Sequence, residues 1–142
     1  MKNISLPQKE LRLLSAQLQN FQQGYTVQQI RSLDRIIKIT DEVLKPFVEG
    51  LNKILINDQS HNNEKEKQEF EIKKQSLIEA YFNLEGNKEV NCSFIDEDFD
   101  FVKSVWLRMG TLNGTKEARE AILKIDDAIQ GAKEPVFEKG VN

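Results

Sequence analysis

The chain has 142 residues, of which 30% are charged and 39% hydrophobic, and 20 Lys and Arg against 23 Asp and Glu give a formal net charge of -3. This length is typical of one compact domain, so a second full domain is not expected. Since the chain has one Cys and one His, its composition excludes an intramolecular disulfide, a zinc site built from several cysteines and any site that needs two imidazoles.

Charge and hydropathy limit the cellular compartments and the classes of partner that can be expected. No stretch approaches the roughly 20 apolar residues of a membrane span, and the first residues lack the apolar core of a secretion signal. We therefore expect a cytoplasmic protein with no membrane partner. A pI near 5.3 argues against a nucleic-acid partner, which needs clustered Lys and Arg. Residues 1–57 carry eight basic and five acidic side chains, whereas 58–100 carry five and twelve. Two interpretations are open: these charges lie on solvated helix faces, or the two parts attract each other within one fold or between two copies.

A first helix is expected over residues 7–23. Ser5 can cap its start, Pro7 lies near the first turn, where a missing N–H costs nothing, and Gly24 follows as a stop. Its apolar residues are three or four positions apart, which places them on one helical stripe. They are Leu11, Leu14, Leu18 and Phe21.

A second, longer helix is expected from Thr26, which stands three residues before Gln29, the spacing of a capping box. Pro46 should kink this helix, because proline removes a backbone hydrogen bond. Its apolar residues follow a heptad pattern, which favours a facing helix, and the first helix is the nearest antiparallel partner. The seam consists of Ile30, Leu33, Ile37, Thr40, Leu44, Phe47, Leu51 and Ile54.

This seam is longer than the first helix can cover. Its distal residues Phe47, Leu51 and Ile54 must therefore pack on the third helix or on a partner protein, which makes them candidate contact residues. The polar run 57–67 reads as an exposed loop that enters a third helix, rich in Lys and Glu and ending at Gly86. We expect the apolar stripe of that helix to carry Phe70, Leu77, Tyr81 and Leu84.

The spacing of apolar residues changes at residues 90–95, where apolar and polar side chains alternate as on a half-buried strand. This strand must pair with a short strand near residues 2–4 or with a strand of another chain.

Asp96 then starts a fourth helix with Phe99, Val102, Trp106 and Met109 on its apolar stripe. After a turn at 110–114, Thr115 starts a fifth with Ala118, Ile122, Ile125 and Ile129, and Gly131 ends it.

These elements predict a mainly α fold, a helical hairpin or bundle of four to five helices with one small β-strand element. Residues 1–131 form a single helical domain in this prediction. Residues 132–142 form a tail that is mobile or docks on a partner.

The acidic run Asp96, Glu97, Asp98 and Asp100 is the one carboxylate concentration in the sequence that can be considered for a cation. Its spacing starts like a calcium loop, but Phe101 stands where the turn needs glycine, so that interpretation fails. Three interpretations remain: acids that complement a helix dipole, an acidic docking surface for a basic partner, and a magnesium site.

The remaining reactive residues are poorly placed for chemistry. His61 lies in the polar run, Cys92 lies on the predicted strand as a small buried side chain, and phosphate-binding and nucleophile motifs are absent. We therefore expect no enzyme, with no catalytic, cofactor-binding or metal-binding residues. Trp106 either fills the core or, if exposed, is an interface hot spot together with Arg108.

The order of these features resembles a group of short bacteriophage accessory proteins of unknown function. The Leu-rich start at 11–14, the long amphipathic helix at 30–56, the Lys- and Glu-rich helix and the strand at 90–95 carry the resemblance, which is one of layout and composition over about residues 5–100. It implies a small protein that acts by contact, either with host machinery or inside the virion.

Together, these observations predict a non-enzymatic accessory protein that binds and modulates a host or phage protein in the host cytoplasm. The alternative is a structural or assembly component of a phage particle, such as a ring, connector or tail. In that case 90–95 and the tail would be contacts between copies in a homo-oligomer. A more remote alternative is a magnesium-dependent hydrolase that uses Asp96, Asp98 and Asp100.

Overall fold

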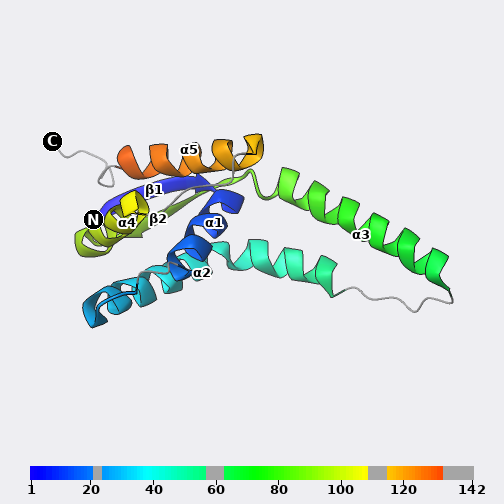
Figure 1. Ribbon diagram of the computed structural model, residues 1–142, viewed down its shortest axis with the longest axis horizontal. Helices are drawn as coiled ribbons and strands as arrows, with labels where there is room; N and C mark the ends of the chain where they lie inside the picture. Colours follow the sequence, from blue (N-terminus) through cyan, green and yellow to red (C-terminus); the bar gives the residue numbers. More distant parts are fainter. Residues whose placement is uncertain (21–23, 57–62, 109–114, 133–142) are drawn as a thin grey trace, which may run out of the picture.

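The computed structural model describes residues 1–20, 24–56, 63–108 and 115–132 (Figure 1). Within these ranges the elements are β1 (Lys2–Pro7), α1 (Gln8–Gln19), α2 (Val27–Leu55), α3 (Glu64–Leu84), β2 (Glu89–Phe94), α4 (Asp96–Arg108) and α5 (Lys116–Gln130). This confirms the mainly α fold with one small β element. Phe21, His61, Met109, the turn at 110–114 and residues 133–142 lie outside the described ranges. None of the described helices combines the length and apolar content needed to cross a membrane.

The strand predicted at 90–95 is confirmed as β2, and its partner is the amino-terminal strand β1. The two pair antiparallel, with Ile4 opposite Cys92 and Leu6 opposite Val90. One face of the pair is buried, as alternation requires, and Ile4, Leu6 and Cys92 lie on it. Burial raises the pKa of the Cys92 thiol to about 11, so the thiol is neutral at physiological pH.

The first helix begins at Gln8, within one residue of the predicted start, but the predicted cap at Ser5 is wrong. β1 continues to Pro7, so Ser5 lies in the strand and donates to the side chain of Asn91 instead of capping a helix. The backbone groups of residues 2–7 pair with β2, so they are not available to start a helix. The free N–H groups at the start of α1 are instead satisfied by the chain that follows α3: Gln8 N donates to Lys88 O at 2.9 Å and Lys9 N to Gly86 O at 3.0 Å.

Gly86 permits this close approach. A Cβ at this position would lie 2.4 Å from the carbonyl oxygen of Phe82 and 3.2 Å from Cβ of Lys9. The Gln8 side chain adds a third link, from Nε2 to the carbonyl oxygen of Glu85 at 2.8 Å. The end of α3 is therefore fixed to the start of α1.

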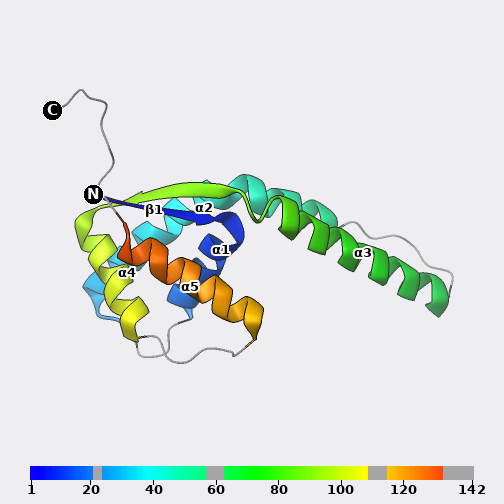
Figure 2. The same ribbon diagram turned by 90° about the horizontal axis from the view of Figure 1, so that it is seen from above.

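The predicted capping box at the start of α2 is confirmed. Gln29 N donates to Thr26 Oγ1 at 3.2 Å, and Thr26 N donates to Gln29 Oε1 at 2.9 Å. The helix continues through Pro46. Figures 1 and 2 both show α2 bending near its middle, as a proline inside a helix predicts.

The heptad seam predicted for α2 is wrong in its first part. Ile30 is half exposed, and Leu33 and Ile37 are half-buried. The fully buried positions of α2 are Ser32, Ile36, Thr40, Leu44, Phe47 and Leu51. Most of these steps are four residues, a spacing that packs against crossing helices and does not follow the 3.5-residue repeat of a coiled coil.

The sheet and four of the helices form a body around one core. α1 and α5 pack on β1, and α2 packs on α1, α4 and β2. Predicted stripe residues of α1, α4 and α5 are buried there, which confirms them as core. They are Leu11, Leu14, Leu18, Phe99, Val102, Trp106, Ile125 and Ile129.

The distal part of α2 (residues 47–55) and α3 (Glu64–Leu84) together form what we call the arm. Figures 1 and 2 show α3 extending away from the body, with the distal part of α2 beside its base. None of the residues of α3, all of which the structure describes, is buried. The fold is therefore a packed body with a projecting helical hairpin.

Candidate functional site: the arm and the residues at its base

The distal seam residues chosen from the sequence pack within the chain. Phe47 and Leu51 are buried and Ile54 is half-buried, with α3 as the helix that packs on α2 here. The Phe47 ring stacks on Tyr81, with ring centroids 5.2 Å apart, and meets Phe82 edge-on at 5.5 Å. These three rings join the two helices of the arm at its base, where Phe47 is part of the core of the body and Tyr81 and Phe82 pack against that core.

Tyr81 also binds the backbone of α2. Its hydroxyl donates to the carbonyl oxygen of Phe47 at 2.5 Å, and burial raises the pKa of Tyr81, which keeps the donor protonated. Gly50 makes room for this contact, because a Cβ there would lie 2.3 Å from the Tyr81 hydroxyl oxygen. On the other side, the guanidinium of Arg12 lies 5.9 Å from the centroid of the Phe82 ring.

The acidic run fixes α4 to α2 and to the start of the chain. Asp98 is buried and accepts two hydrogen bonds from Arg35, from Nε to Oδ2 at 2.9 Å and from Nη2 to Oδ1 at 2.6 Å. This hydrogen bonding raises the pKa of Arg35. Glu97 accepts from Nε2 of Gln28 at 2.8 Å. Arg35 and Asp98 thus join the basic first part to the acidic middle part within one fold, which was one of the two open interpretations of the charge distribution.

The other acids of the run are solvent-exposed. Asp96 lies 2.8 Å from the amino-terminal ammonium, whose hydrogen bond lowers the pKa of this carboxyl group, and Asp100 is exposed. The described residues contain no group of three His, Cys, Asp or Glu side chains that could hold a metal ion. The carboxylates of the run therefore make separate contacts, with Arg35, with Gln28 and with the amino-terminal ammonium.

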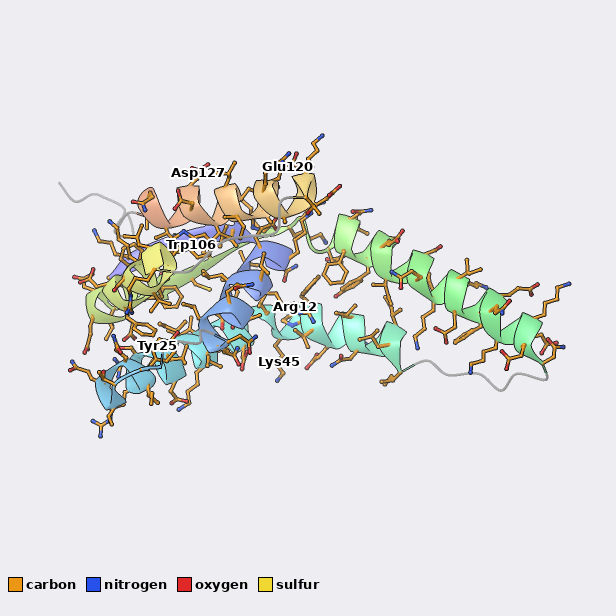
Figure 3. All side chains as sticks on the ribbon, viewed as in Figure 1. Arg12, Tyr25, Lys45, Trp106, Glu120 and Asp127 are labelled. Carbon is orange, nitrogen blue, oxygen red and sulfur yellow. The ribbon has the colours of Figure 1, made fainter. Side chains whose placement is uncertain are left out.

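Trp106 and Arg108 differ in burial. Trp106 is buried, and its Nε1 donates to Oδ1 of Asp126 at 2.9 Å, which joins α4 to α5. Figure 3 shows Trp106 on the side of α4 that faces α5. Arg108 is exposed in the last turn of α4, with Nε 3.4 Å from the carbonyl oxygen of Ser104. Of the two open interpretations of Trp106, the structure supports the core.

The exposed apolar side chains concentrate on the arm. Of the eleven large hydrophobic residues that are exposed within the described ranges, five belong to the arm or to the residue that follows α2. They are Leu55, Ile56, Ile72, Leu77 and Leu84. Three of them lie on α3, where Ile72 is 68%, Leu77 49% and Leu84 67% exposed. Apolar side chains gathered on an uncovered element mark a contact surface more often than scattered ones do.

Sequence reasoning missed Gly50, Ile72 and the direction of α3. The residues of α3 that are partly covered are Phe70, Lys74, Ile78, Tyr81 and Phe82, so the stripe that faces α2 is rotated away from Leu77 and Leu84. The signal was present in the spacing, because Phe70, Lys74 and Ile78 follow each other at intervals of four. The pattern could not show that the opposite side would have no covering helix.

No protein-family model, no curated protein and no solved structure matches this chain.

The Arg35–Asp98 pair predicts an asymmetric response to substitution. Arg35→Met leaves a buried carboxylate without its cation and should lower the free energy of unfolding by about 3–5 kcal/mol. Asp98→Asn keeps the shape and leaves the half-exposed Arg35 to water, so a loss of about 1–2 kcal/mol is expected. Urea unfolding of both variants measures the difference. Equal losses, or a larger loss for Asp98→Asn, would contradict the burial of Asp98.

The Gly50–Tyr81 contact predicts a sign reversal. Gly→Ala inside a helix normally stabilises by about 1 kcal/mol, but Gly50→Ala should instead destabilise, by about 1–2 kcal/mol, because the Tyr81 hydroxyl loses its bond to Phe47. In a Tyr81→Phe background, which lacks the hydroxyl, the same substitution should cost less. A double-mutant cycle from urea unfolding measures this coupling, and a cycle without coupling energy would rule the contact out.

Proposed function

We propose that the protein acts by binding another protein, and that the arm is its contact surface. The observation that carries this proposal is the helix α3, which has 21 residues, none of them buried, and three exposed large apolar side chains. Most helices in proteins are stabilised by burying an apolar face, so a helix without one is the element that gains most from a partner.

The chemistry of the arm suggests the kind of partner. Its exposed apolar residues are aliphatic. Acidic and basic side chains alternate closely from Glu64 to Lys74, in the turns of α3 that precede Leu77. An amphipathic helix of another protein can cover such a surface, with its apolar residues on Leu77 and Leu84 and charges on either side. The resemblance of the layout to short bacteriophage accessory proteins favours a host or phage protein as the source of that helix.

A second copy of the chain is the other candidate partner, as a ring or tail component would require. Because α3 carries both signs of charge, two arms can lie antiparallel with opposite charges facing each other, which completes a four-helix arrangement. Light scattering on the purified protein distinguishes the two cases: a monomer favours a foreign partner, and a dimer or larger ring favours a second copy.

The test replaces apolar side chains on the arm and compares them with a matched pair on the body. Leu77→Ser with Leu84→Ser removes two exposed leucines from α3, whereas Leu107→Ser with Leu123→Ser removes two similarly exposed leucines from α4 and α5. A photo-reactive amino acid at Ile72 then reports contacts in a cell extract, and the same amino acid at the exposed Ser104 of α4 reports background.

We expect a discrete cross-linked product from position 72 that the arm pair abolishes and the body pair preserves. Both variants should keep their helical content, because all four leucines are exposed. Cross-linking that is equal from positions 72 and 104, or that survives loss of Leu77 and Leu84, would contradict the proposal.

A further inference from the structure

A groove with a volume of about 570 Å³ lies between α1 and α5, on the body and separate from the apolar side chains of the arm. Its apolar lining comes from Leu13 and Ala16 of α1 and Ala121 of α5. In Figure 3, Arg12 on α1 and Glu120 on α5 mark the two helices that form it. The small side chains leave room for a bound group to approach both helices closely, and the volume lies within the range of ligand pockets.

Glu10 lines this groove and is buried, with 3% of its side chain exposed. Its Oε2 has no hydrogen-bond partner anywhere in the described ranges. The cation beside it, Nζ of Lys124, lies 3.7 Å from Oε1, which is longer than a direct hydrogen bond. A buried carboxylate oxygen without a donor destabilises a fold, and such atoms are rare in proteins. The groove is therefore lined by a residue whose buried acceptor has no donor within the described ranges.

We propose that this groove binds an arginine side chain of another polypeptide, with the guanidinium on Glu10. A guanidinium has parallel N–H donors that match the two oxygens of a carboxylate. In Glu10, Oε2 has no hydrogen-bond partner within the described ranges, and Oε1 has Nζ of Lys124 at 3.7 Å. An ammonium group is a point charge and would repeat what Lys124 already supplies. Apolar residues beside the arginine would lie on Leu13, Ala16 and Ala121.

In this proposal Lys124 is the side chain that moves, because its Nζ lies 3.7 Å from the other oxygen of the same carboxylate. Oε2 has no surface open to solvent, so the guanidinium can reach it only after a neighbouring side chain moves. Lys124 is half exposed and ends on a flexible four-carbon stem, so its Nζ can leave Oε1 for water. The site therefore binds by exchange of one cation for another, with a bidentate pair replacing a long monodentate contact.

The test uses two blocked tripeptides that differ in one side-chain group: acetyl-leucyl-arginyl-leucine amide, and the same peptide with citrulline in place of arginine. Citrulline has nearly the shape of arginine, but a carbonyl oxygen replaces one nitrogen, so it lacks both the positive charge and the second terminal N–H donor pair. Titration of each into the ¹⁵N-labelled chain follows the backbone amides of α1 and α5 by NMR. Three variants accompany the wild type: Glu10→Gln, Lys124→Met, and the control Glu117→Gln, which removes an exposed acid of the same groove.

The arginine peptide should give saturable shifts in α1 and α5 with an affinity about tenfold or more above that of the citrulline peptide. Glu10→Gln should remove this preference, Glu117→Gln should keep it, and Lys124→Met should strengthen binding because the competing cation is gone. Equal binding of the two peptides, equal losses in the two glutamate variants, or shifts outside α1 and α5 would each overturn the proposal. If Glu10→Gln does not fold, the affinities of the two peptides for the wild type and for Lys124→Met test the proposal. The arm is not involved in any of these outcomes.

Discussion

The antiparallel pairing of β1 with β2 is the contact on which the rest of the arrangement depends. It joins residues 2–7 to 89–94 and so closes more than half of the chain into one loop. The carbonyl groups of Gly86 and Lys88 then satisfy the first N–H groups of α1, which fixes the end of α3 to the same place. α2 spans about 43 Å at 1.5 Å per residue, and α3 spans about 32 Å on the way back. The arm follows from a chain that leaves the body and must return to it.

Burial divides this loop unevenly. In the body, each helix places an apolar stripe on the common core, whereas α3 is held to α2 at its base by the rings of Phe47, Tyr81 and Phe82. Beyond that base, α3 has local support, such as the Asn63 side chain that accepts from Glu66 N at 2.8 Å. Local support of this kind leaves a helix marginal in water. A partner that covers Leu77 and Leu84 would supply the burial that the chain does not.

The sequence patterns predicted which elements form better than what those elements contact. Periodicity placed the helices and the strand, and the Thr26–Gln29 spacing placed the start of α2, because these signals are local. Ser5 failed as a cap because pairing with residues 89–94, far along the chain, took its backbone. Phe47, Leu51, Asp98 and Trp106 have the chemistry of contact residues, and the chain uses all four internally. Their partners lie on other elements, which a one-dimensional pattern does not contain.

Two features that carry the proposals depend on what is missing around a residue. Ile72 and Leu77 lie on a helix whose outer side has no covering element in the described structure, and spacing along α3 cannot report that. Glu10 stands one turn before Leu14 and two before Leu18, so its burial was visible in the 4-residue spacing. The spacing could not show that an oxygen of Glu10 lacks a partner, because this depends on where Lys124 of α5 lies.

The central claim is that α3 is held at its base and buries no residue along the rest of its length. Native-state hydrogen exchange, measured amide by amide without a partner, tests it most directly. The account predicts that amides in the first three turns of α3 exchange about 100-fold or more faster than those of α1 and α4, with protection rising towards Tyr81. Protection along all of α3 that equals that of the body would contradict it.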